Sequence, residues 1–180
     1  MKNLFFLSIF SFMLLTFSSC EEDESLNPLA PKIGGQFVKI DFDKANDQLI
    51  FDEIDNTSFR GMMYNQSGNV VKYELYVQRR IANVATSDYV LLDTYTSFPH
   101  QMEITPALIA SALNISVSDL RNGDQFRFLG YSYDAAGNKC GFNNLSRTVQ
   151  IANFLEQGYK FNTHIIDRAR RDGDFNNRQI

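Results

Sequence analysis

The sequence has no tryptophan and only two histidines and two cysteines among its 180 residues. An enzyme needs a nucleophile with a base, a carboxylate pair or a metal cluster, and neither His100 nor His164 has the spacing of a metal site or a triad. His100 follows Pro99 and is interpreted as a surface residue rather than a catalytic base. The sequence therefore predicts a protein that is not an enzyme and uses no cofactor.

Cysteine is too scarce to cross-link the fold. If Cys20 is modified, as argued below, Cys140 is the only thiol left, and no intramolecular disulfide can form. Only Lys139 and Arg147 supply positive charge near Cys140 in the sequence, so we interpret Cys140 as a partly buried small residue rather than a reactive nucleophile. The fold must therefore depend on its hydrophobic core.

Carboxylates are the only dense class of potential metal ligands. They form two groups, which are Asp41, Asp43 and Asp47, and then Asp52, Glu53 and Asp55. The first group begins like a calcium-binding loop, but Ala45 stands at the third ligand position and no glycine supplies the sharp turn. We therefore predict no metal site and favour a solvated acidic edge, with a calcium site assembled from loops as the alternative.

The first 20 residues have the order of a secretory signal. Lys2 precedes an apolar run from Leu4 to Phe17, which is shorter than the roughly 20 residues of a stable membrane span, and two serines then lead to Cys20. The residues before this cysteine resemble the bacterial lipobox, where a signal peptidase cuts before a lipid-modified cysteine. The resemblance implies that residues 1–19 are removed and that acyl chains such as palmitate anchor Cys20 in a membrane. An ordinary signal peptide with a chance cysteine is the alternative.

Residues 20–33 follow as an acidic tether. Four consecutive acids occupy positions 21–24, and a stretch rich in proline and asparagine comes after them. An acidic run beside a lipid anchor resembles the surface-export signal of lipoproteins in the Bacteroidota. This resemblance implies an outer-membrane location with the protein facing the cell exterior. A solvated tether that specifies no leaflet is the alternative.

From residue 34 to residue 154 the sequence alternates with period two between turn residues, a pattern typical of a β-sandwich or barrel. The clearest strands are 70–79, where Val71, Tyr73, Leu75 and Val77 share a face, and 125–133, where Phe126 and Phe128 lie opposite Leu129, Tyr131 and Tyr133. Aromatic residues on both faces indicate that the strand at 125–133 is central. Weaker strands are predicted at residues 37–42, 49–51, 58–64, 89–96, 102–104 and 147–152.

Turns and caps divide these strands. The segments 65–69 and 134–138 tolerate positive φ and are each predicted to join two strands as a hairpin. Thr105 can cap a helix that extends to Leu113, and a second helical turn covers residues 116–121. The predicted fold class is all-β, an antiparallel sandwich of seven to eight strands with a short helical insertion near residues 105–121.

The C-terminal residues 155–180 are polar and rich in asparagine and arginine. We predict a C-terminal extension outside the sandwich, which either pairs or docks elsewhere or, more simply, is a frayed tail. The net charge of −4, without a basic stripe, argues against nucleic acid as a partner.

Several segments between residues 34 and 153 carry a further resemblance. They include Phe59-Arg60-Gly61, Tyr73-Glu74-Leu75-Tyr76-Val77, Ser97-Phe98-Pro99 and Gly123-Asp124-Gln125-Phe126. Together these segments resemble the immunoglobulin-like domain of small Bacteroidota surface lipoproteins, similar to the N-terminal module of SusE-type outer-membrane proteins encoded with polysaccharide-uptake transporters. The resemblance implies an immunoglobulin/fibronectin-III-like sandwich. It also implies a cell-surface accessory or interaction module of a nutrient-uptake complex, with an outer-membrane transporter or other surface lipoproteins as partners.

Direct binding of a glycan or another ligand is the alternative function. The sequence has no counterpart of the later carbohydrate-binding domains of SusE-type proteins, which argues against it. Sugar platforms usually stack a pyranose ring on an exposed Trp or Tyr, and here Tyr64, Tyr76 and Tyr95 are the candidates for exposure. Such a site would use these rings on one sheet or the loops beside Asn65 and Asn138, although core packing is the default for each tyrosine.

Overall fold

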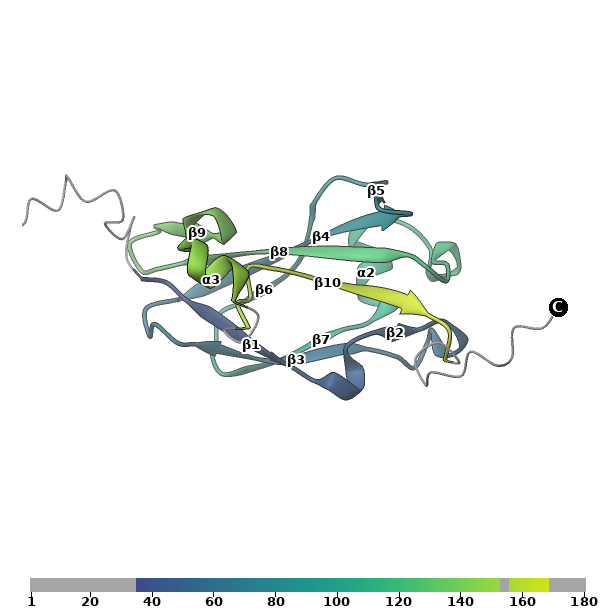
Figure 1. Ribbon diagram of the computed structural model, residues 1–180, viewed down its shortest axis with the longest axis horizontal. Helices are drawn as coiled ribbons and strands as arrows, with labels where there is room; N and C mark the ends of the chain where they lie inside the picture. The colour runs from purple at the N-terminus through teal and green to yellow at the C-terminus, as the bar shows by residue number, and fades with distance from the viewer. Residues whose placement is uncertain (1–34, 153–155, 169–180) are drawn as a thin grey trace, which may run out of the picture. The chain divides into compact units, whose positions relative to one another are not determined.

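The computed structural model describes residues 35–152 and 156–168. The described strands, drawn in Figure 1, are β1 (Val38–Phe42), β2 (Leu49–Ile50), β3 (Phe59–Asn65), β4 (Lys72–Ile81), β5 (Val84–Ala85), β6 (Val90–Tyr95), β7 (His100–Ile104), β8 (Gln125–Tyr133), β9 (Lys139–Gly141) and β10 (Lys160–Ile166). The described helices are short, namely η3 (Lys44–Asn46), η4 (Phe51–Glu53), α2 (Pro106–Ala112), η5 (Val117–Asp119), η6 (Phe142–Asn144) and α3 (Arg147–Ile151). In this part of the chain, no helix has the length and apolar character needed to cross a membrane.

The strands form two sheets that face each other as a sandwich (Figure 1). The smaller sheet has the order β1-β3-β7, and the larger has the order β2-β10-β8-β4-β5, with β6 also paired to β4 and β9 to β8. The strand pairs are antiparallel except β2 with β10, which is parallel. The predicted all-β sandwich is confirmed.

The two strands with the clearest sequence pattern form the middle of the larger sheet. Tyr73, Leu75 and Val77 of β4 are fully buried, as their alternation predicts. Val71 differs, because it precedes the strand and is 47% exposed. Strand β8 begins and ends at the predicted residues and lies between β4 and β10, so its predicted central position is confirmed.

Aromatic rings from both sheets meet in the core. Phe59 of β3 stacks on Phe128 of β8 with ring centroids 6.0 Å apart. Phe161 of β10 lies 4.9 Å from Phe128 and 5.1 Å from Phe42 of β1. Burial of one such ring contributes about 1.5–3 kcal/mol, so this cluster is a main source of adhesion between the sheets.

The C-terminal segment corrects the sequence prediction. Residues 155–180 are predicted to lie outside the sandwich, but residues 160–166 form β10, which pairs with both β8 and β2. Its inward residues Phe161, Thr163 and Ile165 alternate with polar ones, a period-two pattern that the surrounding polar sequence conceals. The described residues of the sandwich therefore continue past position 154 to the end of β10, and residues 169–180 lie outside the described range.

Two other local predictions are wrong. The segment 147–152, rich in β-branched residues, forms helix α3 because Ser146 caps it and accepts a hydrogen bond from the Val149 amide at 3.4 Å. The turn at 65–69 is not a hairpin, since β3 pairs with β1 and β7 while β4 belongs to the other sheet. The turn at 134–138 does form the predicted hairpin, which joins β8 to β9.

The predicted helical insertion is confirmed between β7 and β8. The Thr105 hydroxyl accepts a hydrogen bond from the Leu108 amide at 3.2 Å, and Pro106 is the first residue of α2. Ser116 and Asp119 form a capping box around η5.

A buried tyrosine hydroxyl ties the start of β1 to the larger sheet. Tyr159, which is fully buried just before β10, accepts a hydrogen bond from the Val38 amide at 3.2 Å and donates one to the Gln36 carbonyl at 3.1 Å. The Ser132 hydroxyl of β8 lies 2.9 Å away and donates to the same oxygen. Burial raises the pKa of the Tyr159 phenol above its usual value, so the group remains a donor.

We expect Tyr159→Phe to lower the free energy of unfolding by about 1–3 kcal/mol, because it leaves buried partners without a hydrogen bond. Urea unfolding of the full chain measures this change. Tyr64→Phe is the matched control, since that hydroxyl has no hydrogen bond among the described residues, and its effect should stay within about 0.5 kcal/mol. An equal loss in both variants would contradict the role of the Tyr159 hydroxyl.

Candidate functional site

The described residues do not assemble a metal centre or a reactive thiol. Within residues 35–152 and 156–168, no group of three or more His, Cys, Asp or Glu side chains is placed to hold a metal ion. In the first acidic group Asp43 caps η3, where its carboxylate accepts from the Ala45 amide at 2.9 Å. Burial raises the pKa of Cys140, which is 6% exposed, so its thiol is mostly protonated at neutral pH.

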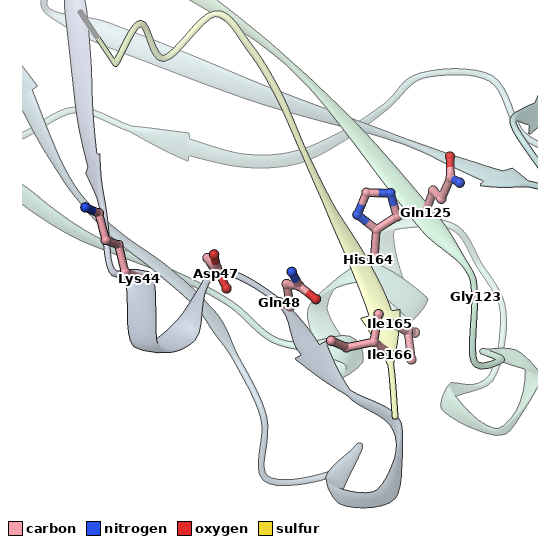
Figure 2. A pocket seen from close by; sticks show the side chains of 8 residues that line it. All are labelled: Lys44, Asp47, Gln48, Gly123, Gln125, His164, Ile165 and Ile166. Atoms are coloured by element: carbon pink, nitrogen blue, oxygen red, sulfur yellow. The ribbon is translucent and has the colours of Figure 1, made fainter. Parts of the chain in front are cut away.

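A hollow of the described structure lies over the edge where β10 meets β2 (Figure 2). It measures about 640 Å³, and its lining consists of Lys44, Asp47, Gln48, Gly123, Gln125, His164, Ile165 and Ile166. Figure 2 shows His164 of β10 beside Gln125 of β8. The described lining residues of the hollow include no serine, threonine or cysteine beside His164. The other histidine, His100, is half-buried against the Tyr95 ring at 4.9 Å.

The three tyrosines predicted to be exposed have different surroundings, and no site brings them together. Tyr95 is 5% exposed and packs 6.2 Å from the ring of Tyr73, so the expectation of an exposed ring is wrong there. It is the last residue of β6, and its period places it on the inner face. Tyr64 and Tyr76 are half-buried, on different sheets. Cys20, the predicted acylation site, lies outside the described residues.

Tyr64 lines a second hollow, formed by loops at one end of the sandwich. This hollow measures about 580 Å³, and its lining consists of Tyr64, Asn65, Gln66, Val70, Thr96, Ser97, Phe98 and Pro99. The Asn65 amide is already engaged in holding the turn, because it donates to the Val70 carbonyl at 2.9 Å. The remaining amide and hydroxyl groups and two aromatic rings suit a small polar ligand.

Tyr76 belongs to a broader surface on the outer side of the larger sheet. We name the outward side chains of β4, β8, β9 and β10, together with Leu91 of β6, the tyrosine face. Its three central rows consist of directly paired residues, namely Leu91, Tyr76, Leu129 and Lys160, then Glu74, Tyr131 and Gly141, and then Lys72, Tyr133 and Lys139. Leu91 is 48% exposed, and the three tyrosines are half-buried.

Glu74 fixes two of these tyrosines. Its carboxylate accepts hydrogen bonds from the Tyr133 hydroxyl at 2.8 Å and the Tyr76 hydroxyl at 3.2 Å, and it pairs with the Lys72 ammonium at 2.8 Å. The Lys72 contact, opposed by partial burial, holds the pKa of Glu74 below its usual value, and the two hydroxyls lower this pKa further. The ring of Tyr131 packs edge-on against Tyr76 with centroids 5.6 Å apart. The tyrosine side chains are therefore held in defined orientations.

Lysine ammonium groups lie over three aromatic rings of this region. Lys139 lies 3.7 Å from the centroid of Tyr131, and Lys72 lies 4.0 Å from that of Tyr133. Lys160 lies 4.9 Å from the Phe142 ring in the neighbouring η6. These contacts hold the ammonium groups against the sheet.

A small hollow of about 290 Å³ adjoins the face where β8, β9 and η6 meet. Its lining consists of Tyr89, Arg127, Leu129, Gly130, Tyr131, Gly141, Phe142, Asn143, Asn144 and Lys160. A Cβ atom at Gly141 would approach the Tyr131 ring to 2.8 Å, so glycine allows this ring to lie close to β9. The hollow combines aromatic, amide and cationic groups.

No protein-family model matches the chain, and comparison with curated proteins and with solved structures finds no significant match.

Sequence reasoning places Tyr131 and Tyr133 correctly on the face opposite Phe126, but it does not identify them as site residues. The two-residue period of a strand could have identified them. Once Tyr73 is inward on β4, this period turns Tyr76 outward, and it turns the tyrosines of β8 that lie opposite Phe126 outward as well. Tyr76 lies next to Leu129 because of the register between β4 and β8. The sequence pattern does not specify this register.

We expect Lys72→Ala to raise the pKa of the Glu74 carboxyl toward its ordinary value of about 4.3, because the variant removes the main charged donor. NMR titration of the side-chain carboxyl measures this shift, and Lys44→Ala, which leaves the tyrosine face unchanged, is the control. Since the folded pKa lies below the unfolded one, Glu74 stabilises the fold above the unfolded pKa. This stabilisation is lost as the pH falls through the folded pKa, and an unchanged pKa in Lys72→Ala would contradict the assignment.

Proposed function

We propose that this protein is a non-enzymatic, lipid-anchored module of the outer cell surface that binds a partner protein through its tyrosine face. The observation that carries the proposal is the fixed cluster of Tyr76, Tyr131 and Tyr133 on the outer side of the larger sheet, beside the exposed Leu91. Tyrosine is enriched in protein interfaces because it contributes a large contact area at low cost in conformational entropy. An apolar and aromatic centre with a charged rim is the usual composition of an interface.

The position of the cluster also supports a binding role over a catalytic one. The rings lie on the outer side of the larger sheet, where Tyr131 also lines the hollow of about 290 Å³. The described residues around them include neither a histidine–nucleophile pair nor a metal ligand set. A hydrogen-bonded carboxylate such as Glu74, whose pKa is lowered, is suited to hold donors in place rather than to act as an acid at neutral pH.

The fold type belongs to the same proposal. Of the seven longer strands, β1, β3 and β7 form one sheet, and β4, β6, β8 and β10 belong to the other. This division supports an immunoglobulin/fibronectin-III-like sandwich in which β6, the fourth long strand of the chain, lies beside β4, the third. Domains of this type commonly serve as cell-surface modules, which agrees with an accessory role in a nutrient-uptake complex, although fold by itself does not define activity.

The anchor is proposed from the sequence. Acylation at Cys20, followed by an acidic tether, would attach the sandwich to the outer membrane and leave it free to meet a transporter or another surface lipoprotein.

A mild-detergent pull-down of the full-length tagged protein from its native outer membrane tests this proposal. We expect a partner protein in stoichiometric amount, which is lost with the unanchored control Cys20→Ala and reduced at least about fivefold by Leu91→Asp, because a charge in the interface centre remains unpaired. Val84→Asp, at an exposed site on β5 away from the tyrosine face, should retain the partner. Recovery of the protein alone, or equal loss in both aspartate variants, would contradict the proposal.

Direct capture of a glycan is a second candidate, favoured by the hollow at Tyr64. The half-buried Tyr64 and Phe98 rings lie there with Thr96, Ser97 and Gln66, a combination that suits the apolar face and the hydroxyls of a sugar.

If this hollow binds a glycan, Tyr64→Ala should weaken binding of a neutral oligosaccharide at least about tenfold in calorimetric titration, because stacking on the ring is lost. Tyr89→Ala, outside the hollow, is the control and should bind like the parent chain. Absence of heat with a panel of neutral oligosaccharides would exclude this second candidate.

A further inference from the structure

The tyrosine face carries a charge opposite to that of the whole chain. The chain has a net charge of −4, yet the outward lysine, arginine and acidic residues of β4, β8, β9 and β10 are Lys72, Arg80, Arg127, Lys139 and Lys160 against the single acid Glu74. Acidic residues are thus concentrated elsewhere on an acidic protein. A like-charged cluster destabilises the compact state by self-repulsion, so this segregation requires an explanation.

Four of these five cations have no carboxylate partner among the described residues. One of them, Arg80, is hydrogen-bonded to the Gln78 side chain and the Asn83 carbonyl instead. Lys139 contacts the rings of Tyr131 and Tyr133, and Lys160 contacts the ring of Phe142. Arg127 lines the 290 Å³ hollow next to Lys160, and no hydrogen bond or ion pair engages its guanidinium within the described residues. Lys72 differs, because Glu74 already neutralises it. Three of the four cations without a carboxylate partner therefore lie where β8, β9 and β10 meet the hollow.

The aromatic rings here are unsuited to sugar stacking. A pyranose needs an open ring face, but Lys139 covers the Tyr131 ring and Lys72 covers the Tyr133 ring, at 3.7 and 4.0 Å from the centroids. Tyr76 is held edge-on to Tyr131 and hydrogen-bonded to Glu74. What the surface presents outward is a set of ammonium groups held over rings, together with the Arg127 guanidinium, beside the apolar Leu91 and Leu129. Such a set is complementary to carboxylates.

We propose that the partner recognised by the tyrosine face presents an acidic polypeptide surface, whose carboxylates pair with Lys139, Lys160 and Arg127. The inference rests on the proposed function and specifies the chemistry of the partner at that same face. Arg127 can receive one carboxylate through two parallel hydrogen bonds, while the two lysines act as point charges held by their rings. The tyrosines and leucines supply the apolar centre, and the cations supply orientation and fast association.

Binding of labelled poly-L-glutamate to the full-length protein in detergent tests the chemistry directly, with polygalacturonate of matched length as the carbohydrate probe. We expect poly-L-glutamate to bind more tightly than polygalacturonate, and Lys139→Glu/Lys160→Glu to weaken its binding at least about tenfold. Both lysines are exposed, so the fold should be retained, and thermal unfolding checks this. The control Lys44→Glu/Arg60→Glu makes the same charge change on other surfaces and should weaken binding less than about twofold.

Equal weakening in the two double variants, or tighter binding of polygalacturonate, would overturn the inference. The membrane pull-down separates this failure from that of the proposed function. Loss of the partner with Lys139→Glu/Lys160→Glu but not with the control supports an acidic partner. If the partner is lost with Leu91→Asp but retained with Lys139→Glu/Lys160→Glu, the tyrosine face remains the interface and the acidic chemistry is rejected. If both variants retain the partner, the tyrosine face itself is rejected as the interface.

Discussion

The hydroxyl of Tyr159 constrains the whole sandwich, because it joins the beginning of the described chain to the segment that leads into its last described strand. It connects the backbone at Gln36 and Val38 to Ser132 of the central strand β8. The adjacent Gly158 amide donates to the Val38 carbonyl at 2.9 Å, so the backbone repeats the connection that the side chain makes. Strand β10 starts at this junction and lies between β2 and β8.

The inward packing of Tyr73 at this junction determines which side chains of β4 lie on the outer surface. The Tyr73 hydroxyl donates to the Gly158 carbonyl, which requires β8 to have no side chain at Gly130, where a Cβ atom would lie 2.6 Å from that carbonyl. Once Tyr73 is fixed inward, the two-residue period of β4 turns Glu74 and Tyr76 outward. The orientation of the tyrosine face is therefore a consequence of core packing, and the ordered core gives the surface its preorganisation.

Much of this fold can be predicted from the sequence where the local pattern is strong. The limits of β8, the inward residues of β4 and the Thr105 cap follow from periodicity and capping chemistry. Strand β10 is not evident in this way, because its inward residues gain their stability from distant partners on β8 and β1 rather than from neighbours in sequence. The same reason limits prediction of the site, since Lys139, Lys160 and Arg127 come together only through strand pairing.

The cation–aromatic contacts connect the fold to the chemistry of recognition. An exposed lysine usually loses considerable side-chain entropy when it binds a partner, but Lys139 is already held over Tyr131 and Lys160 over Phe142. Since the rings attract the ammonium groups without neutralising their charge, the groups stay available to an incoming carboxylate. A glutamate or aspartate in place of either ring would fix the lysine equally well but cancel its charge. The use of aromatic rather than acidic neighbours therefore favours a surface built to recognise an external anion.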